Sequence, residues 1–280
     1  MISLLIEPFS FPFMVRALIA AGVTGAVCAL VGTYVILRGM AFFGDALAHS
    51  VLPGVAVGYL VGRGSRTVVL WWALGAAVLA ALGMGALARR ARLKEDTAIG
   101  IVFVIMFALG IALISTHRGY AVDLAHFLFG NVLGVSPTQL HIVIVLSAVV
   151  SMLVLVFHRG FLLISFDAVL AHTLRIPVRL LNTLLLLLLA VTVVVCLQTV
   201  GIALTLAMLV LPPSTGFLLA RRVSTMMAIS TVAGVAASVL GLYLSYYSGI
   251  AAGPSIVLVS GALFLATLVL SPLRRLMLTR

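Results

Sequence analysis

Asp45 and His49 are the residues of this sequence whose types and spacing could do chemistry. They lie four residues apart in the run GDALAHSVLPG (residues 44–54), which is otherwise almost entirely apolar. Residues at positions i and i+4 share one face of a helix, and ionisable groups inside membrane segments usually face a cavity or a pathway. Carboxylate oxygens and imidazole nitrogens are both ligands for divalent metals. The pair therefore predicts half of a metal site.

Each residue of the pair also has an ordinary structural interpretation. Asp45 could cap the start of a helix near the membrane interface, and His49 could be a histidine hydrogen-bonded in the core. Pro53 follows His49 by four residues and removes a backbone hydrogen bond, which predicts a kink beside the pair. Because one chain offers only two ligands, a twofold homodimer with the path on its axis would supply up to four.

The composition indicates the class of protein that carries this pair. Hydrophobic residues make up 64% of the chain and charged residues 8%, which leaves too little polar surface for a soluble protein. Crossing the membrane takes about 20 apolar residues. We expect an all-α polytopic membrane protein with eight or nine spans in one domain, residues 1–280. The segments 180–197 and 199–220 could be a tight hairpin or a broken helix rather than two full spans. The candidate segments are 13–37, 43–62, 67–88, 97–116, 138–157, 180–197, 199–220, 224–246 and 254–272.

The basic residues indicate how the chain is oriented. Most of the 17 Lys and Arg fall in alternate connections, which are expected to be cytoplasmic. This distribution places the N-terminus outside and the C-terminus in the cytoplasm. The net charge of +11 is spread over short loops that face lipid and cytoplasm, so nucleic-acid binding is not expected. Cys28 and Cys196 are expected to pack in the membrane interior, and small residues such as Gly22, Gly25 and Gly75 to allow close helix packing.

The source of energy is indicated by residues that the sequence lacks. A nucleotide-binding P-loop needs a lysine after glycine, and Lys94, the only lysine, follows Leu93. We therefore expect that the chain is not itself an ATPase and binds no cofactor tightly. Its six acidic residues also do not form the intramembrane carboxylate chain that many proton-driven carriers use. The protein is expected either to conduct passively or to be driven by a partner.

The connection between the fifth and sixth segments favours a partner. In the segment of about 161–178, Phe166, Leu170 and Leu174 are apolar at helical spacing, and Asp167 is placed to cap or begin a short helix. This pattern predicts a cytoplasmic amphipathic helix. Such a helix could lie in the membrane interface or dock onto another protein.

Several of these segments together resemble the membrane subunit (permease) of bacterial ATP-binding-cassette importers for zinc and manganese, the ABC-3 family. The resemblance implies a type II-like importer permease in the bacterial inner membrane, with Asp45 and His49 as metal ligands that line the path. It implies that Phe166, Asp167, Leu170 and Leu174 belong to a coupling helix. It also implies two ATPase subunits that consume ATP, and an extracytoplasmic protein that delivers Zn²⁺ or Mn²⁺. The segments that carry the resemblance are 44–54, EDTAIG (95–100), DLAHFLFGN (123–131), 166–167 and SYY (245–247).

Other functions remain open at the level of the residues. Asp123 and His126, three residues apart in the outer connection of 117–137, could form a gate or secondary site, or could make structural hydrogen bonds. An uncoupled divalent-cation channel or secondary carrier would transport without a partner. A scaffold would not need Asp45 and His49, and an importer of a chelate or vitamin would need a wider path. Because Asp and His serve Zn²⁺, Mn²⁺ and Fe²⁺ alike, the residues predict a class of metal.

Overall fold

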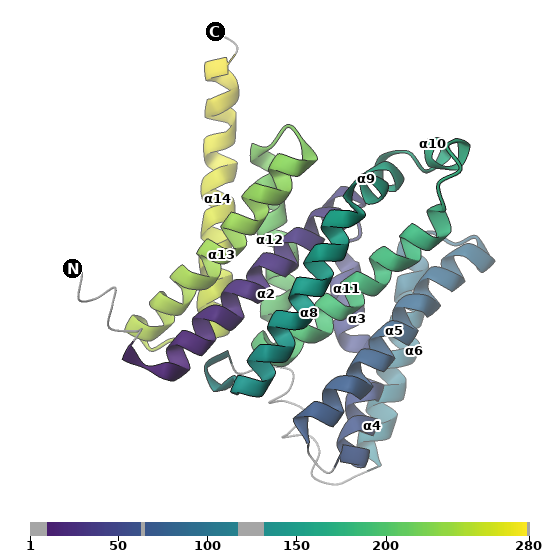
Figure 1. Ribbon diagram of the computed structural model, residues 1–280, viewed down its shortest axis with the longest axis horizontal. Helices are drawn as coiled ribbons and strands as arrows, with labels where there is room; N and C mark the ends of the chain where they lie inside the picture. Colours follow the sequence, from purple (N-terminus) through teal and green to yellow (C-terminus); the bar gives the residue numbers. More distant parts are fainter. Residues whose placement is uncertain (1–9, 63–64, 117–131, 279–280) are drawn as a thin grey trace.

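The computed structural model describes residues 10–62, 65–116 and 132–278, which form a bundle of helices without strands in these ranges (Figure 1). Nine stretches of this described chain are long and apolar enough to cross a membrane. They coincide with the nine predicted segments, so the all-α fold is confirmed. The single-helix spans are α2 (Pro12–Leu37), α5 (Arg66–Ala91), α6 (Glu95–Ser115), α8 (Pro137–Val156), α11 (Val178–Val200), α12 (Ile202–Leu219), α13 (Val223–Ser248) and α14 (Ala252–Leu278); η2 (Val132–Gly134) is a short 3₁₀ turn before α8.

The second span is broken into two helices, α3 (Ala41–Ser50) and α4 (Leu52–Gly62). The break falls at Val51, immediately after the segment that carries Asp45 and His49. Pro53 has no amide hydrogen and stands where the carbonyl of His49 would otherwise find its helical partner. The predicted kink beside the pair is therefore present, and it separates the helix of the pair from the rest of the span.

The sixth and seventh spans are two separate helices joined by a single residue. Gly201 ends α11 and begins α12, with a φ of 82°, in a backbone region that glycine adopts without steric cost. Each of the two helices is long enough to be a candidate span by itself. The structure therefore supports two full spans, as the count of nine predicts, rather than one broken helix.

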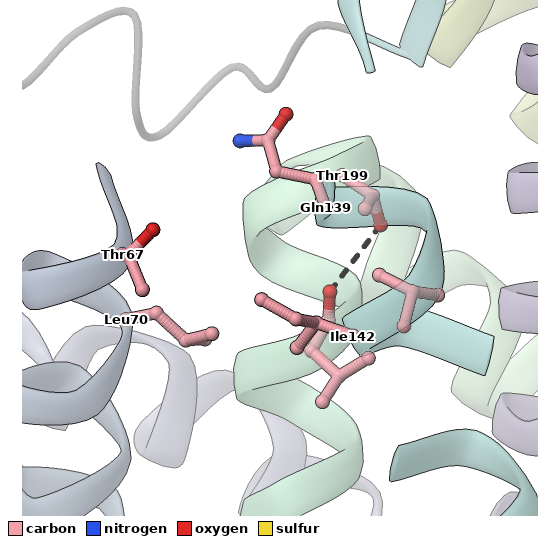
Figure 2. A pocket seen from close by; sticks show the side chains of 7 residues that line it. Thr67, Leu70, Gln139, Ile142 and Thr199 are labelled. Carbon is pink, nitrogen blue, oxygen red and sulfur yellow. Dashed lines mark hydrogen bonds between the residues drawn. The ribbon is translucent and has the colours of Figure 1, made fainter. Parts of the chain in front are cut away.

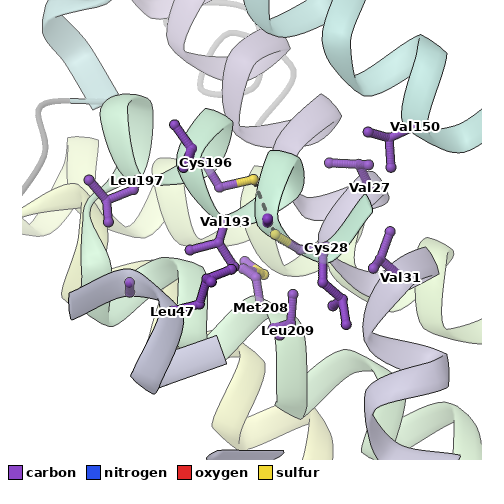
Figure 3. Close-up of a cluster of buried hydrophobic side chains, with 14 of the residues drawn as sticks. Val27, Cys28, Val31, Leu47, Val150, Val193, Cys196, Leu197, Met208 and Leu209 are labelled. Carbon is purple, nitrogen blue, oxygen red and sulfur yellow. Dashed lines mark hydrogen bonds between the residues drawn. The ribbon is translucent and has the colours of Figure 1, made fainter. Parts of the chain in front are cut away.

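The core of the bundle is built around α2, which packs against α8, α11, α12 and α13. Cys28 of α2 and Cys196 of α11 meet there with their sulfur atoms 3.2 Å apart, among side chains that include Leu47 and Met208 (Figure 3). Both cysteines are free and fully buried. The prediction that they pack in the apolar interior is confirmed, although the sequence did not indicate that they touch each other.

Close helix packing depends on which glycine faces a neighbouring helix. A Cβ atom on Gly25 would lie 2.8 Å from the carbonyl oxygen of Gly234 in α13, so these two backbones approach each other directly. A Cβ atom on Gly22 or Gly75 would have no neighbour within 4 Å. The prediction is thus confirmed for Gly25 and wrong for Gly22 and Gly75, because glycine spacing does not reveal how a helix is rotated.

This difference predicts opposite effects of two alanine substitutions on α2. Gly25→Ala should destabilise the folded protein by about 1–3 kcal/mol through overpacking, whereas Gly22→Ala should stabilise it by roughly 0.5–1 kcal/mol through helix propensity. Thermal unfolding of the detergent-solubilised protein measures both. Equal melting temperatures for the two variants would contradict the packing described between α2 and α13.

Two short helices follow α8 outside the spans: α9 (His158–Phe166) and α10 (Ala168–Thr173). In Figure 1, α10 and the last turns of α14 lie at the upper end of the bundle, whereas α2 begins at the lower end. The first and last spans therefore open and close the bundle at opposite ends, as an odd number of spans requires.

Candidate metal site

Asp45 and His49 lie side by side on α3. The Nε2 atom of His49 is 3.5 Å from Oδ1 of Asp45, as the spacing of four residues predicts. The side chains are 29% exposed for His49 and 38% exposed for Asp45, so the pair is open on one side of the subunit. The structure thus brings together the two residues on which the sequence analysis centred.

The separation of the two atoms suits a shared ion. Bonds from Zn²⁺ to nitrogen and oxygen ligands are about 2.0–2.2 Å long, so one ion can reach both atoms with an angle of about 110° between the bonds. Across the described residues, no third His, Cys, Asp or Glu completes a cluster. Asp123 and His126, the predicted gate or secondary site, lie outside the described residues. The described part of one chain offers half of a coordination shell.

Two phenylalanines of α6 hold the imidazole ring of His49. The ring centroid lies 6.0 Å from that of Phe103 and 5.5 Å from that of Phe107, the latter in an edge-on arrangement. The Nδ1 atom is buried and has no hydrogen-bond partner. Packing against α6 therefore orients this ring, while Nε2 faces Asp45. Sequence reasoning missed both phenylalanines; their spacing of four places them on one helix face, but no pattern links that face to α3.

A cavity of 180 Å³ lies beside the start of α3, on the side away from the pair. Phe43 of α3 and Met40, the residue before α3, line it together with Arg89 and Glu95. Residues 43 and 45 are two positions apart on a helix and so point in nearly opposite directions. The cavity is therefore separate from the face that carries Asp45. Its remaining lining residues are Met84, Gly85, Ala88, Leu93, Ile99, Asn182 and Leu186.

A smaller pocket lies between α5, α8 and α11 and offers no charged ligand (Figure 2). Thr67, Gln139 and Thr199 are its polar residues, and the others are apolar. The Thr199 hydroxyl donates to carbonyl oxygens of its own helix, at 3.3 Å from Val195 and 3.0 Å from Cys196. Of the sites described here, only the pair on α3 combines a carboxylate with an imidazole.

The segment after α8 bends at Asp167. The sequence predicts one amphipathic helix over about 161–178, whereas the structure has α9 and α10 with an extended residue, Asp167, between them (φ −147°, ψ 91°). The backbone amides of Val169 and Leu170 donate to Asp167 Oδ1 at 3.0 and 2.8 Å. Asp167 thus caps a new helix, as its position predicts, and this cap sets α10 apart from α9.

Four apolar side chains around α10 are exposed, and we call them the α10 surface. Their exposed fractions are 65% for Phe166, 75% for Val169, 46% for Leu170 and 58% for Leu174. Large apolar groups outside the spans cost free energy in water, and exposed apolar patches commonly mark protein or membrane contacts. The structure therefore presents the predicted apolar positions outward rather than toward the bundle.

The chain is similar to known proteins along most of its length. Residues 10–271 match the family model described as the ABC 3 transport family. The manganese transport system membrane protein MntC of Halalkalibacterium halodurans is 43% identical over 94% of this chain and 89% of its own. The manganese import system permease protein ScaB of Streptococcus gordonii is 40% identical over 95% and 94%.

Further matches extend the likeness to another metal and to a solved structure. The chelated iron transport system membrane protein YfeD of Yersinia pestis is 39% identical over 95% of this chain and 88% of its own. The solved structure described as PsaBC from Streptococcus pneumoniae in complex with Fab has a chain that is 39% identical, with a TM-score of 0.82 and 95% of both chains covered. The family match over residues 10–271 includes α3 and α10.

Proposed function

Because this chain belongs to the ABC 3 transport family, we propose that Asp45 and His49 bind the metal ion that it transports. The protein is the transmembrane permease subunit of an ATP-binding-cassette importer for divalent transition metals. The main observation in support of this metal site is that a carboxylate oxygen and an imidazole nitrogen lie 3.5 Å apart within a membrane span. Such groups are costly among apolar helices, and a passing dication would offset that cost.

The donor set fits the ions that similar proteins are named for. Relatives are named for transport of manganese and of chelated iron. One oxygen and one imidazole nitrogen suit Mn²⁺, Zn²⁺ and Fe²⁺, and the absence of a thiolate at the pair disfavours Cu⁺. We propose Mn²⁺ or Zn²⁺ as the cargo of this chain.

The surroundings of His49 suit an ion that must leave again. Metal-binding histidines usually donate their second ring nitrogen to a partner, and loss of that partner lowers metal affinity by about 10–100-fold. Nδ1 of His49 is buried without such a partner. The ring is oriented by Phe103 and Phe107 instead, so the site is shaped for binding without being strengthened for retention.

The open side of the pair supports a dimer. Asp45 and His49 are partly exposed on the surface of the subunit. The adjacent helix α6 is apolar, and most of its residues are not buried within the subunit. Ionisable groups that face lipid are expensive, so another protein surface or a water-filled path has to cover them. We propose that a second copy of this chain does so and supplies the remaining ligands.

The other proposed partners follow from the α10 surface and the family. Two ATPase subunits would dock on the α10 surface and hydrolyse ATP, since transport rather than catalysis is the role of this chain. An extracytoplasmic metal-binding protein would deliver the ion at the opposite end. In this proposal, α10 and the C-terminus lie in the cytoplasm.

Reconstitution tests coupling against passive transport. Proteoliposomes that contain this chain, its ATPase and its binding protein should accumulate Mn²⁺ or Zn²⁺ only when ATP is supplied. Vesicles with this chain alone should show no more flux than empty vesicles. Equal flux through the chain alone would instead establish an uncoupled channel or carrier.

A further inference from the structure

A buried tyrosine joins α9 to the centre of the bundle. Tyr34 of α2 is fully buried, and its hydroxyl lies 2.7 Å from Nδ1 of His158, the first residue of α9. The other ring nitrogen of His158 lies 3.5 Å from the hydroxyl of Ser224, in the first turn of α13. One imidazole thus bridges α2 and α13 where α8 passes into α9.

Aromatic packing strengthens the same junction. Phe161, one turn after His158, is fully buried and packs edge-on against Tyr34 with ring centroids 5.5 Å apart. A Cβ atom on Gly160 would lie 2.9 Å from Cδ1 of Leu181, so α9 also approaches α11 closely. The start of α9 is therefore fixed to the bundle, whereas the α10 surface, which begins at Phe166 at the end of α9, is exposed.

The C-terminal end of α2, where Tyr34 lies, continues into the helix that carries the metal pair. The connection of residues 38–40 is held by backbone hydrogen bonds, from the amide of Arg38 to the carbonyl of Tyr34 at 3.0 Å and from Met40 to Val35 at 3.0 Å. The Arg38 guanidinium donates to the side-chain oxygen of Asn182 in α11. Only this short, bonded turn separates α2 from α3. A movement of Tyr34 would therefore reach α3 through a continuous set of contacts.

We propose that Tyr34 and His158 are positioning residues that transmit movement of α10 through α9 and α2 to Asp45 and His49. This inference rests on the proposed function, because it assumes that an ATPase acts on the α10 surface. Packed side chains and hydrogen bonds can carry coupling between distant sites when they form a contiguous network. The network here runs from α10 to α9 along the chain, from α9 to α2 by the Tyr34–His158 bond, and from α2 to α3.

The test measures metal ions transported per ATP hydrolysed by the complete complex in proteoliposomes. Tyr34→Phe keeps the ring that packs on Phe161 and removes only the hydroxyl. His158→Leu removes the other partner. Both should lower the ratio by about fivefold or more, the lower end of the usual range for coupling between sites, while ATP hydrolysis stays near the wild-type rate. His158→Asn should restore the ratio, because its amide can hydrogen-bond the tyrosine hydroxyl.

Two further variants sharpen the result. The double variant Tyr34→Phe with His158→Leu should be no worse than either single variant, because both break the same bond. Tyr247→Phe, at the opposite end of α13, should leave the ratio unchanged. An unchanged ratio in Tyr34→Phe and His158→Leu would overturn the proposal. A parallel fall in transport, hydrolysis and melting temperature would also overturn it and would indicate a purely structural role.

The outcomes separate this inference from the proposed function. If the wild-type complex transports metal and Asp45→Ala abolishes transport while Tyr34→Phe has no effect, the inference alone fails. If the wild-type complex does not transport metal at all, the proposed function fails first.

Discussion

Alanine at Asp45 or His49 is expected to reduce metal uptake by the complete importer at least about tenfold, since loss of a mere supporting partner of a metal ligand already costs 10–100-fold in affinity or activity. Each substitution removes one of the two donors that lie 3.5 Å apart. Because one ion uses both donors, the double variant should lose little more than either single variant. Uptake of ⁵⁴Mn²⁺ or ⁶⁵Zn²⁺ by cells without their own high-affinity importers measures the effect and identifies the cargo.

Matched variants make this result specific. Asp45→Asn keeps the size of the side chain and removes its charge, so it should also be impaired. His141→Ala removes an exposed histidine whose ring hydrogen-bonds its own helix through the Pro137 carbonyl, and it should transport normally. All variants are compared at equal abundance and with the ATPase bound. Normal uptake in Asp45→Ala and His49→Ala would refute the site and direct attention to Asp123 and His126.

The second large effect is expected at the α10 surface. Replacing Phe166 and Leu174 together with alanine should weaken binding of the ATPase subunit at least about tenfold, since burial of one large apolar side chain contributes about 1.5–3 kcal/mol. Both side chains are more than half exposed in the free subunit. Co-purification of the ATPase and a titration of the solubilised subunits measure the loss.

A control of similar size and exposure is available on α14. Leu258 and Leu265 are 62% and 58% exposed, close to the values of 65% and 58% for Phe166 and Leu174. Their double alanine variant should bind the ATPase normally. If the Phe166 and Leu174 variant also binds the ATPase normally, the α10 surface instead contacts the membrane interface.

The spans could be predicted because membrane thickness fixes their length. Runs of about 20 apolar residues located all nine candidates, and Pro53 located the break after α3. The division of the segment after α8 at Asp167 was only partly predictable. The sequence indicates a capping aspartate, but no residue pattern indicates that the backbone becomes extended at Asp167 and separates α9 from α10.

The contacts between helices could not be predicted from the pattern. A helix that is apolar on every side has no stripe to show which face packs inward. This is why Phe103 and Phe107 against His49, the bond from Tyr34 to His158 and the different environments of Gly22 and Gly25 became visible only in the structure. Within the pair, by contrast, Asp45 and His49 share one helix, so their spacing alone placed them together.

The sulfur contact in the core has a practical consequence for labelling. The chain has two cysteines, and both are buried where α2 meets α11. Thiol reagents attack accessible thiolates, so these native groups should react slowly in the folded protein. A single cysteine placed on the α10 surface, for example by Val169→Cys, would be labelled selectively without removing either native cysteine. Because the native cysteines should be labelled little, fluorescence or spin-label measurements of how α10 moves during the transport cycle can be made in the wild-type sequence.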